Sequence, residues 1–236
     1  VVLITTKKGK IGVTQVNFDL QYGIQNVAKK LDLLTADQYT MISDEALANA
    51  GKTAVWNNPG KGTGTNWQDA IFRSAAFQKY DLSVNSGNDK TRYILGVGYY
   101  SQDGVVRFSD FTRYNIRFNI DSKVTDKLTI GSNINVSRID QDLIDTEING
   151  VARAAIFQPP TIPVYNADGS YAGPGANEGD AQNPLGMAER SNMNLKKNEF
   201  FGNLFAEFKL MPDLVFRSSL GLNVYSSQSN DFNPTF

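Results

Sequence analysis

Two residue types that build many catalytic and redox sites are missing from this chain. Its 236 residues include no cysteine and no histidine. Without cysteine the chain forms no disulfide and no thiolate metal site. Without histidine as well, it assembles neither a Ser-His-Asp triad nor a Cys-His pair. The usual nucleophilic hydrolases are therefore excluded, and we expect no enzyme and no cofactor.

Charge of one sign and long apolar runs are also scarce. The 23 Lys and Arg residues nearly balance the 24 Asp and Glu, which leaves a formal net charge of −1. No basic block is present of the kind that neutralises phosphates, so nucleic acid is not an expected partner. No apolar run approaches the ~20 residues that a membrane-spanning helix needs. With 41% hydrophobic residues, the chain is nevertheless expected to fold.

What the chain does contain is a repeated alternation of apolar and polar side chains with a period of two. This period gives a β-strand one apolar and one polar face. The segments that follow it are 16–22, 80–84, 93–99, 114–120, 128–136, 200–210 and 214–224. The chain is therefore expected to be all-β.

The connections between these segments are alternately short and long. The short ones are 86–90, 123–127 and 211–213, and the long ones are 27–76, 103–110 and 140–198. Outer-membrane barrels have short turns on one side of the membrane and longer loops on the other. We therefore predict a partial antiparallel transmembrane β-barrel with short helices in its extracellular loops. A soluble antiparallel sheet or seven-stranded sandwich shows the same alternation and remains the alternative.

Two side-chain groups support a barrel. Aromatic residues lie near the predicted strand ends, as in an interfacial girdle; they are Tyr22, Tyr80, Tyr99, Tyr100, Phe108, Phe111, Tyr114 and Tyr225. Charged residues of the polar faces are expected to point into the lumen; they include Arg117, Glu199, Glu207 and Arg217.

The long connections contain helical patterns and one hairpin. Thr35 is a predicted N-cap of a helix that stops at Gly51, and Asn66 caps a second helix over 66–73. A third short helix is expected near 148–157, and residues 164–171 read as a hairpin with Asp-Gly at the turn. The glycines at 60, 62 and 64 lack the context of a phosphate-binding loop and predict a linker.

The two ends of the chain suggest a piece of a longer protein. The chain opens on a β-branched run with no initiator Met and no charged-then-apolar leader. Its last residues read as a loop with no closing element. We interpret the chain as an internal fragment.

Several motifs, in order along the chain, resemble SusC/RagA-type TonB-dependent outer-membrane transporters. They are VLITTKKGK at 2–10, KKLDLLTADQY at 29–39, TNWQDAIFR at 65–73, LSVNSGNDKTRY at 82–93, YNADGSY at 165–171 and NPL at 183–185. The resemblance covers nearly the whole chain. It implies a plug-filled barrel of about 22 strands, with residues 1–12 as the end of the plug and residues 13–236 as the first seven or so barrel strands.

The resemblance also implies a function and partners. Such transporters import oligosaccharides or peptides in Bacteroidetes-type bacteria, driven by the inner-membrane TonB-ExbB-ExbD complex, with a SusD-like surface lipoprotein as a lid. The expected surroundings are outer-membrane lipid. The TonB box and most of the plug lie outside this sequence.

Candidate binding residues are few. Trp56 and Trp67 are candidates for stacking on a substrate, although an anchoring role in the loop is favoured for both. Asp140, Asp142, Asp145 and Glu147 form an acidic cluster that offers oxygen ligands for calcium. The cluster departs from EF-hand spacing, because Asp145 stands where Gly is required and Val151 where the last Glu belongs. A solvated loop is the favoured reading, and no metal is expected.

Two other functions are alternatives to import. A soluble carbohydrate-binding or adhesin-like β module accounts for the alternation but not for the short and long connections. A glycoside hydrolase needs two carboxylates at a fixed separation, and the sequence selects no such pair.

Overall fold

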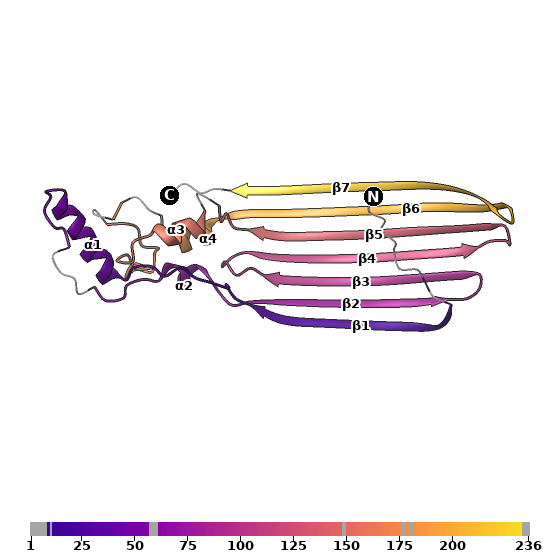
Figure 1. Ribbon diagram of the computed structural model, residues 1–236, viewed down its shortest axis with the longest axis horizontal. Coiled ribbons are helices and arrows are strands. Elements are labelled where there is room, and N and C mark those ends of the chain that lie inside the picture. Colours follow the sequence, from indigo (N-terminus) through magenta and orange to yellow (C-terminus); the bar gives the residue numbers. More distant parts are fainter. Residues whose placement is uncertain are drawn as a thin grey trace.

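The computed structural model describes residues 9, 11–56, 61–147, 150–175, 178–179 and 182–232. Seven strands form one antiparallel sheet in which spatial order equals chain order (Figure 1). The strands are β1 (Gly12–Gln25), β2 (Ala75–Gly87), β3 (Thr91–Asp103), β4 (Asp110–Lys123), β5 (Leu128–Leu143), β6 (Asn192–Met211) and β7 (Leu214–Phe232). The helices are α1 (Ala36–Asn49), α2 (Trp67–Ile71), α3 (Val151–Phe157) and α4 (Pro184–Arg190). The predicted all-β class and its open, partial-barrel form are confirmed.

The strands are longer than the alternation alone predicts. The connection expected over 140–198 begins only after Leu143 and ends before Asn192. Beyond the apolar band, the face that carries Val136 turns polar, with Arg138, Asp140 and Asp142 in β5, so the alternation disappears although the pairing continues. There the amide of Asn194 donates to Asp140 at 2.9 Å and to Asp142 at 2.8 Å, across β5 and β6.

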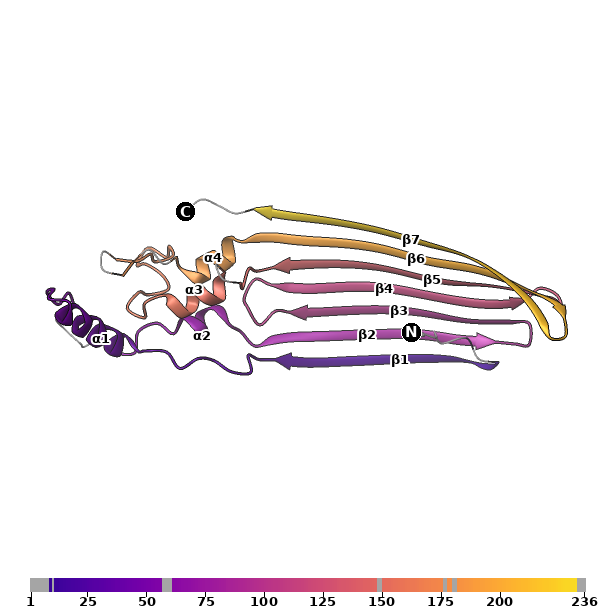
Figure 2. The ribbon, with the colours of Figure 1, turned by 45° about the horizontal axis from the view of Figure 1, so that its top comes forward.

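One face of the sheet is apolar and exposed. Leu222 is 56% exposed and Val97 46%, and the same face continues across every strand from Phe18 to Val224. A soluble sheet would cover such a face with a second layer. In the described part of the chain the helices lie beyond the strand ends rather than over this face (Figures 1 and 2). This arrangement is typical of a surface made for lipid.

A row of tyrosines borders this apolar face on the side of the long loops. Tyr80, Tyr99 and Tyr114 are direct cross-strand neighbours, with ring centroids 6.0 and 5.2 Å apart. This position is that of an interfacial girdle. Tyr100, Phe111 and Tyr225, predicted for the same girdle, lie on the opposite face, because each stands an odd number of residues from the apolar positions of its strand.

The other face is polar and carries fixed charge pairs. Lys79 Nζ lies 2.6 Å from Asp81, and Arg217 donates to Glu207 at 2.8 Å. The guanidinium of Arg217 also lies over the ring of Phe205, 4.3 Å from the centroid, and Phe205 is 7% exposed. Pairing places Arg117 and Glu199 on this same polar face.

The connections separate by length to the two ends of the sheet. Three tight turns join β2 to β3, β4 to β5 and β6 to β7 at one end, and all four helices lie at the other (Figures 1 and 2). Among the described residues, no helix is long and apolar enough to cross a membrane.

Gly9, near the start of the chain, is buried against the backbone of β3. A Cβ added there would lie 2.5 Å from the backbone nitrogen of Tyr93. Only glycine permits this close approach. Of the predicted plug segment 1–12 the structure describes residues 9, 11 and 12, and the assignment of this segment stays a prediction.

Candidate functional site

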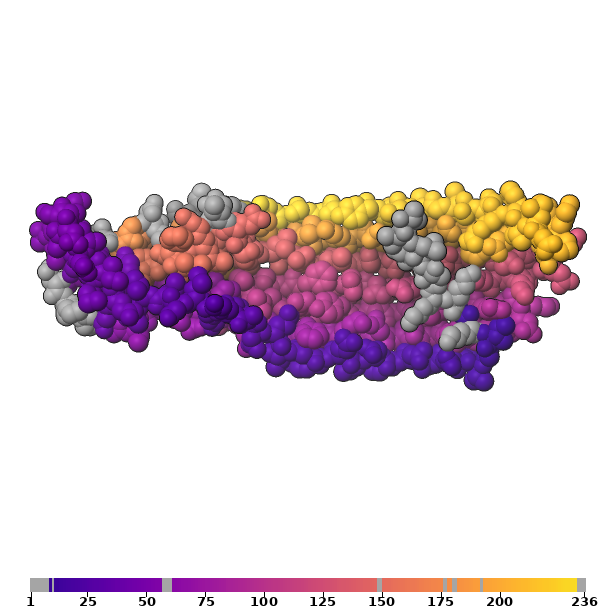
Figure 3. Space-filling view, in the orientation of Figure 1, coloured from indigo at the N-terminus to yellow at the C-terminus, as the bar shows by residue number. Residues whose placement is uncertain are grey.

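The long connections pack into one cluster at the loop end of the sheet. Its buried core brings together residues far apart in sequence: Trp67, Ile71, Val151, Ala155, Ile162, Ala172 and Ala188. These side chains come from α2, α3, α4 and the segment between α3 and α4. In the space-filling view the cluster forms a mass that extends beyond the strand ends (Figure 3).

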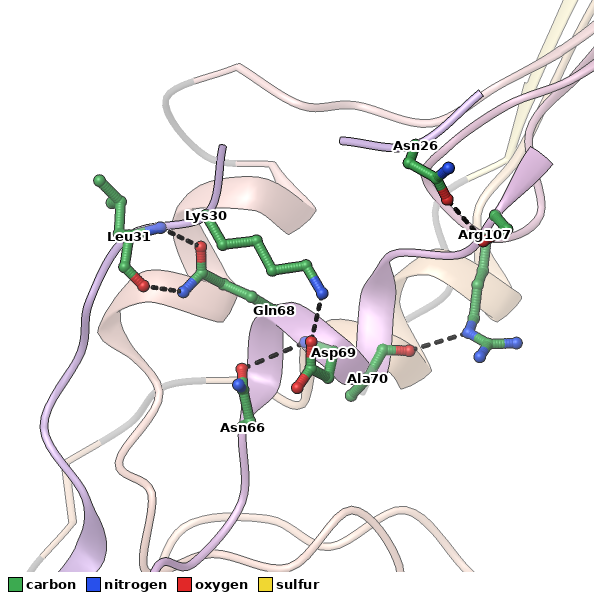
Figure 4. A network of polar contacts seen from close by, with 9 residues as sticks. Asn26, Lys30, Leu31, Asn66, Gln68, Asp69, Ala70 and Arg107 are labelled. Carbon is green, nitrogen blue, oxygen red and sulfur yellow. Dashed lines mark hydrogen bonds and ion pairs between the residues drawn. The ribbon is translucent and has the colours of Figure 1, made fainter. Parts of the chain in front are cut away.

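The short helix α2 is held from several sides. Asn66 caps it by accepting from the Asp69 N–H, as predicted, and Lys30 forms an ion pair with Asp69 (Figure 4). The helix ends at Ile71, two residues earlier than expected. The reason is that Phe72 bridges to Val106 and the Arg73 N–H donates to Val105, so both residues pair with the loop between β3 and β4.

Gln68 makes a two-point contact with the backbone of Leu31. Its side-chain oxygen accepts from the Leu31 N–H and its amide donates to the Leu31 carbonyl, both at 2.8 Å (Figure 4). The donor and acceptor of one carboxamide thus pair with the N–H and C=O of one residue. This contact fixes the segment before α1 onto α2.

The two longest loops are joined to each other near Trp67. The Trp67 indole donates to Pro159 at 3.0 Å, and the Thr65 N–H donates to Pro160 at 2.8 Å. Gly64 has φ +71°, and a Cβ there would lie 2.3 Å from the Pro160 oxygen. Trp67 itself is 2% exposed, so its ring is covered by protein. Its contacts are those of an anchoring residue.

Helix α1 organises the loop that follows it. Thr35 forms the predicted cap, as part of a full capping box with Gln38. Asp37 accepts from the Lys61 and Gly62 N–H groups, and Asp44 accepts from those of Val55 and Trp56. Since Asp37 and Asp44 are seven residues apart, both lie on one face of the helix. Together they fix the returning loop to α1.

A cavity of about 500 Å³ lies between these segments. Its walls come from residues 31–35, 63–68 and 156–160, together with Tyr39. Trp67 is part of the wall, and the ring of Trp56 meets that of Tyr39 edge-on at 6.3 Å. The two candidate tryptophans are therefore near one cavity, one in its wall and one behind it. Among the described residues of the lining, Asp32 is the only acidic or basic side chain.

Gln158 is the unusual residue of this cavity wall. It is 3% exposed, yet neither its amide nitrogen nor its oxygen has a hydrogen-bond partner among the described residues. A buried carboxamide without partners is costly, because it loses its bonds to water and gains none. Burial and the nearby Glu178 also raise the pKa of Tyr39, so its hydroxyl stays neutral and able to donate. The cavity therefore presents neutral hydrogen-bonding groups.

The predicted hairpin closes the far side of the cluster. Tyr165 and Tyr171 pair across its turn, with ring centroids 5.2 Å apart. The Tyr171 hydroxyl donates to Glu189 on α4 at 2.5 Å. Burial and this carboxylate raise the pKa of Tyr171, which keeps the donor protonated. The hairpin is thus bound to α4.

The four acidic candidates do not converge. Asp140 and Asp142 are strand residues of β5 rather than loop residues, and both accept from Asn194. Asp145 instead accepts from the Glu147 N–H at 2.8 Å. Within the described ranges, no group of three acidic side chains is placed to hold a metal ion.

Two features of the cluster were missed from the sequence. Helix α4 begins with Asn183 as N-cap and Pro184 at its first position, and this Asn-Pro pair is a usable start signal. The isolation of Gln158 had no sequence signal, because it results from loops that meet only in the fold.

Comparisons with known proteins point to the same fold. No family model matches the chain. Over its full length it is 28% identical to TonB-dependent receptor P3 of Formosa agariphila, and over 94% of its length 29% identical to TonB-dependent receptor SusC of Bacteroides thetaiotaomicron. The chain spans 23% and 24% of those relatives, respectively. A solved structure of the RagAB peptide importer, in its closed-closed state, superposes on 95% of this chain and 29% of that one, with a TM-score of 0.75 and 19% identity.

Proposed function

Because this chain is a stretch of a SusC/RagA-type TonB-dependent receptor of the bacterial outer membrane, we propose that the whole protein imports oligosaccharides or peptides. The single observation that best supports import is the two-faced sheet, which has exposed apolar residues on one side and ion pairs on the other. Receptors of this kind are not enzymes.

The partners follow from the same family. Residues 1–12 would end a plug domain, and residues 13–236 would form barrel wall. The TonB-ExbB-ExbD complex would act on the plug from the periplasm, and a SusD-like lipoprotein would cover the external face. In this orientation the three tight turns are periplasmic and the helical cluster is extracellular.

The loop cavity is the proposed external contact for substrate. Its described lining is neutral apart from Asp32, and Gln158 has a donor and an acceptor without partners there. Sugar hydroxyls and peptide groups both supply the complementary pair. Trp67 contributes part of the wall, and Trp56 supports Tyr39 behind it.

The proposal is tested on the complete receptor in its own cells. We expect it in the outer-membrane fraction, migrating faster on SDS gels before boiling than after, since a closed barrel resists the detergent. We also expect uptake of an oligosaccharide or peptide that stops when TonB is deleted. A receptor in the soluble fraction without a heat shift would favour a soluble binding module instead.

The Gln158→Met variant separates a binding role from a structural one. Removing an unpartnered buried carboxamide should leave the loop cluster as stable as before or slightly more stable. If Gln158 binds substrate, affinity should nevertheless fall about tenfold, the loss expected for one or two hydrogen bonds. Calorimetric titration and thermal unfolding of the same preparations measure both effects. Gln68→Met is the matched control, because that carboxamide is bonded on both sides and its loss should lower stability.

A further inference from the structure

The polar face of the sheet carries an unassigned group of aromatic and basic side chains just below the loop cluster. Phe77, Tyr100 and Phe111 come from β2, β3 and β4. Their ring centroids are 6.5 Å apart for Phe77 and Tyr100, and 5.9 Å apart for Tyr100 and Phe111. We call this group, with Arg113, the aromatic shelf.

The position of the Phe77 ring depends on a glycine in the neighbouring strand, which leaves space for the ring. Gly23 of β1 pairs with Phe77, and a Cβ at Gly23 would lie 2.3 Å from the phenyl ring. The ring therefore lies over the β1 backbone and leans along the sheet. Phe205 lies over Gly131 in the same way, but there Arg217 covers the ring. Phe77 is only partly buried, and no cation contact covers its ring in the described part of the chain.

Polar groups surround the shelf in fixed positions. The Tyr100 hydroxyl donates to Gln102, whose amide in turn donates to Gln25. The amide nitrogen of Gln25 is buried and has no partner among the described residues. This amide therefore lacks the acceptor that a hydroxyl bound at the edge of the shelf would supply.

The charge of the shelf is positive. Arg113 is exposed, and its guanidinium lies over the Tyr100 ring, 5.9 Å from the centroid. Strand pairing places Lys79, Tyr100, Arg113 and Lys197 in one cross-strand row. Lys79 is neutralised by Asp81 at 2.6 Å. In the ranges that the structure describes, Arg113 and Lys197 are in no ion pair, and their strands are about 10 Å apart.

We infer that the aromatic shelf binds acidic oligosaccharides, with Arg113 holding a sugar carboxylate and the rings stacking on the sugar. A guanidinium forms two parallel hydrogen bonds to a carboxylate. Flat aromatic faces beside it suit the apolar face of a sugar ring, and the unpartnered amide nitrogen of Gln25 suits one of its hydroxyls. Lys197 adds a second cation along the path of the chain. This inference rests on the proposed import function and names its substrate class.

The experiment uses the complete receptor, purified in detergent, and calorimetric titration. The probes are short oligogalacturonates and oligoalginates, each compared with its methyl ester, and acidic peptides as a separate class. The ester keeps the ring and removes the charge. We expect at least one acid form to bind about tenfold or more tightly than its ester. The difference should shrink at high ionic strength.

Variants assign the selectivity to the shelf. Arg113→Gln should remove the preference for the acid form, Lys197→Gln should reduce it, and Arg113→Lys should restore part of it. Arg138→Gln is the matched control: its side chain is exposed but lies on the opposite face of the sheet, beside Tyr114, and should leave the preference unchanged.

Three results would overturn the inference: equal binding of acids and esters, a preference that survives Arg113→Gln, or binding of peptides but of none of the acidic sugars. TonB-dependent uptake of a neutral sugar or peptide would then leave the import function intact. Loss of all TonB-dependent uptake, by contrast, would count against the proposed function itself.

Discussion

Replacing Trp67 by alanine should open the loop cluster while leaving the strands paired. The side chain is 2% exposed and contacts a core drawn from α2, α3 and α4. Truncating a buried tryptophan costs about 3–5 kcal/mol. The variant also leaves the Pro159 carbonyl without its indole donor, which adds about 1 kcal/mol. This loss of stability is larger than one or two short helices can tolerate.

Hydrogen exchange of the complete receptor measures this effect locally. Amides of α3 and α4 should exchange much faster in Trp67→Ala, whereas those in the centre of β3 to β6 should not, because elements open independently. Trp67→Phe keeps most of the volume but not the indole bond and should be intermediate. Trp56→Ala is the control, since that ring is partly exposed and meets Tyr39 only edge-on. Unchanged protection in Trp67→Ala would show that the cluster does not depend on this side chain.

The strands were predictable because each one shows its two different faces in its own alternation of apolar and polar residues. In β4 the residues Tyr114, Ile116 and Phe118 face one side while Asn115 and Arg117 face the other, and no distant contact is needed to see it. The helix starts at Thr35 and Asn66 were predictable for the same reason, since a cap is a local signal.

The extension of β5 and β6 beyond Val136 was not predictable from the alternation. Asp140, Asn194 and Lys196 lie on the face that is apolar in the middle of these strands, so they interrupt the apolar period. The pairing is visible only once the two strands are side by side, where Asn194 bridges Asp140 and Asp142.

The candidate binding groups depend even more on tertiary structure. Gln158 lies about ninety residues from the segment that buries it, and the aromatic shelf combines three strands in a particular register. A shift of one residue in that register would move Tyr100 to the lipid-type face. Sequence reasoning selected the tryptophans by residue type, whereas Arg113 and Gln158 are distinguished only by what surrounds them.

The second large expected effect is that of an arginine placed at either of two adjacent residues of β7, because the two residues lie on opposite faces of the sheet. Leu222 and Asn223 follow each other in β7, so their side chains point to opposite faces. Leu222 is 56% exposed and lies in the middle of the apolar band beside Gly202, whereas Asn223 lies on the polar face beside Phe201. Arginine near the middle of a lipid-facing surface costs about 2–4 kcal/mol, and in a lumen it has little effect on stability.

Leu222→Arg should therefore sharply lower the amount of heat-modifiable receptor in the outer membrane, while Asn223→Arg should accumulate near the wild-type level. Both variants add the same charge one residue apart, so differences in expression or net charge cancel between them. Quantitative blots of unboiled and boiled membrane fractions give the comparison. The opposite ranking would mean that the apolar face packs against protein rather than lipid, and equal levels would mean that β7 lies outside the membrane. Either result would require a different placement of all seven strands, because their register fixes the faces together.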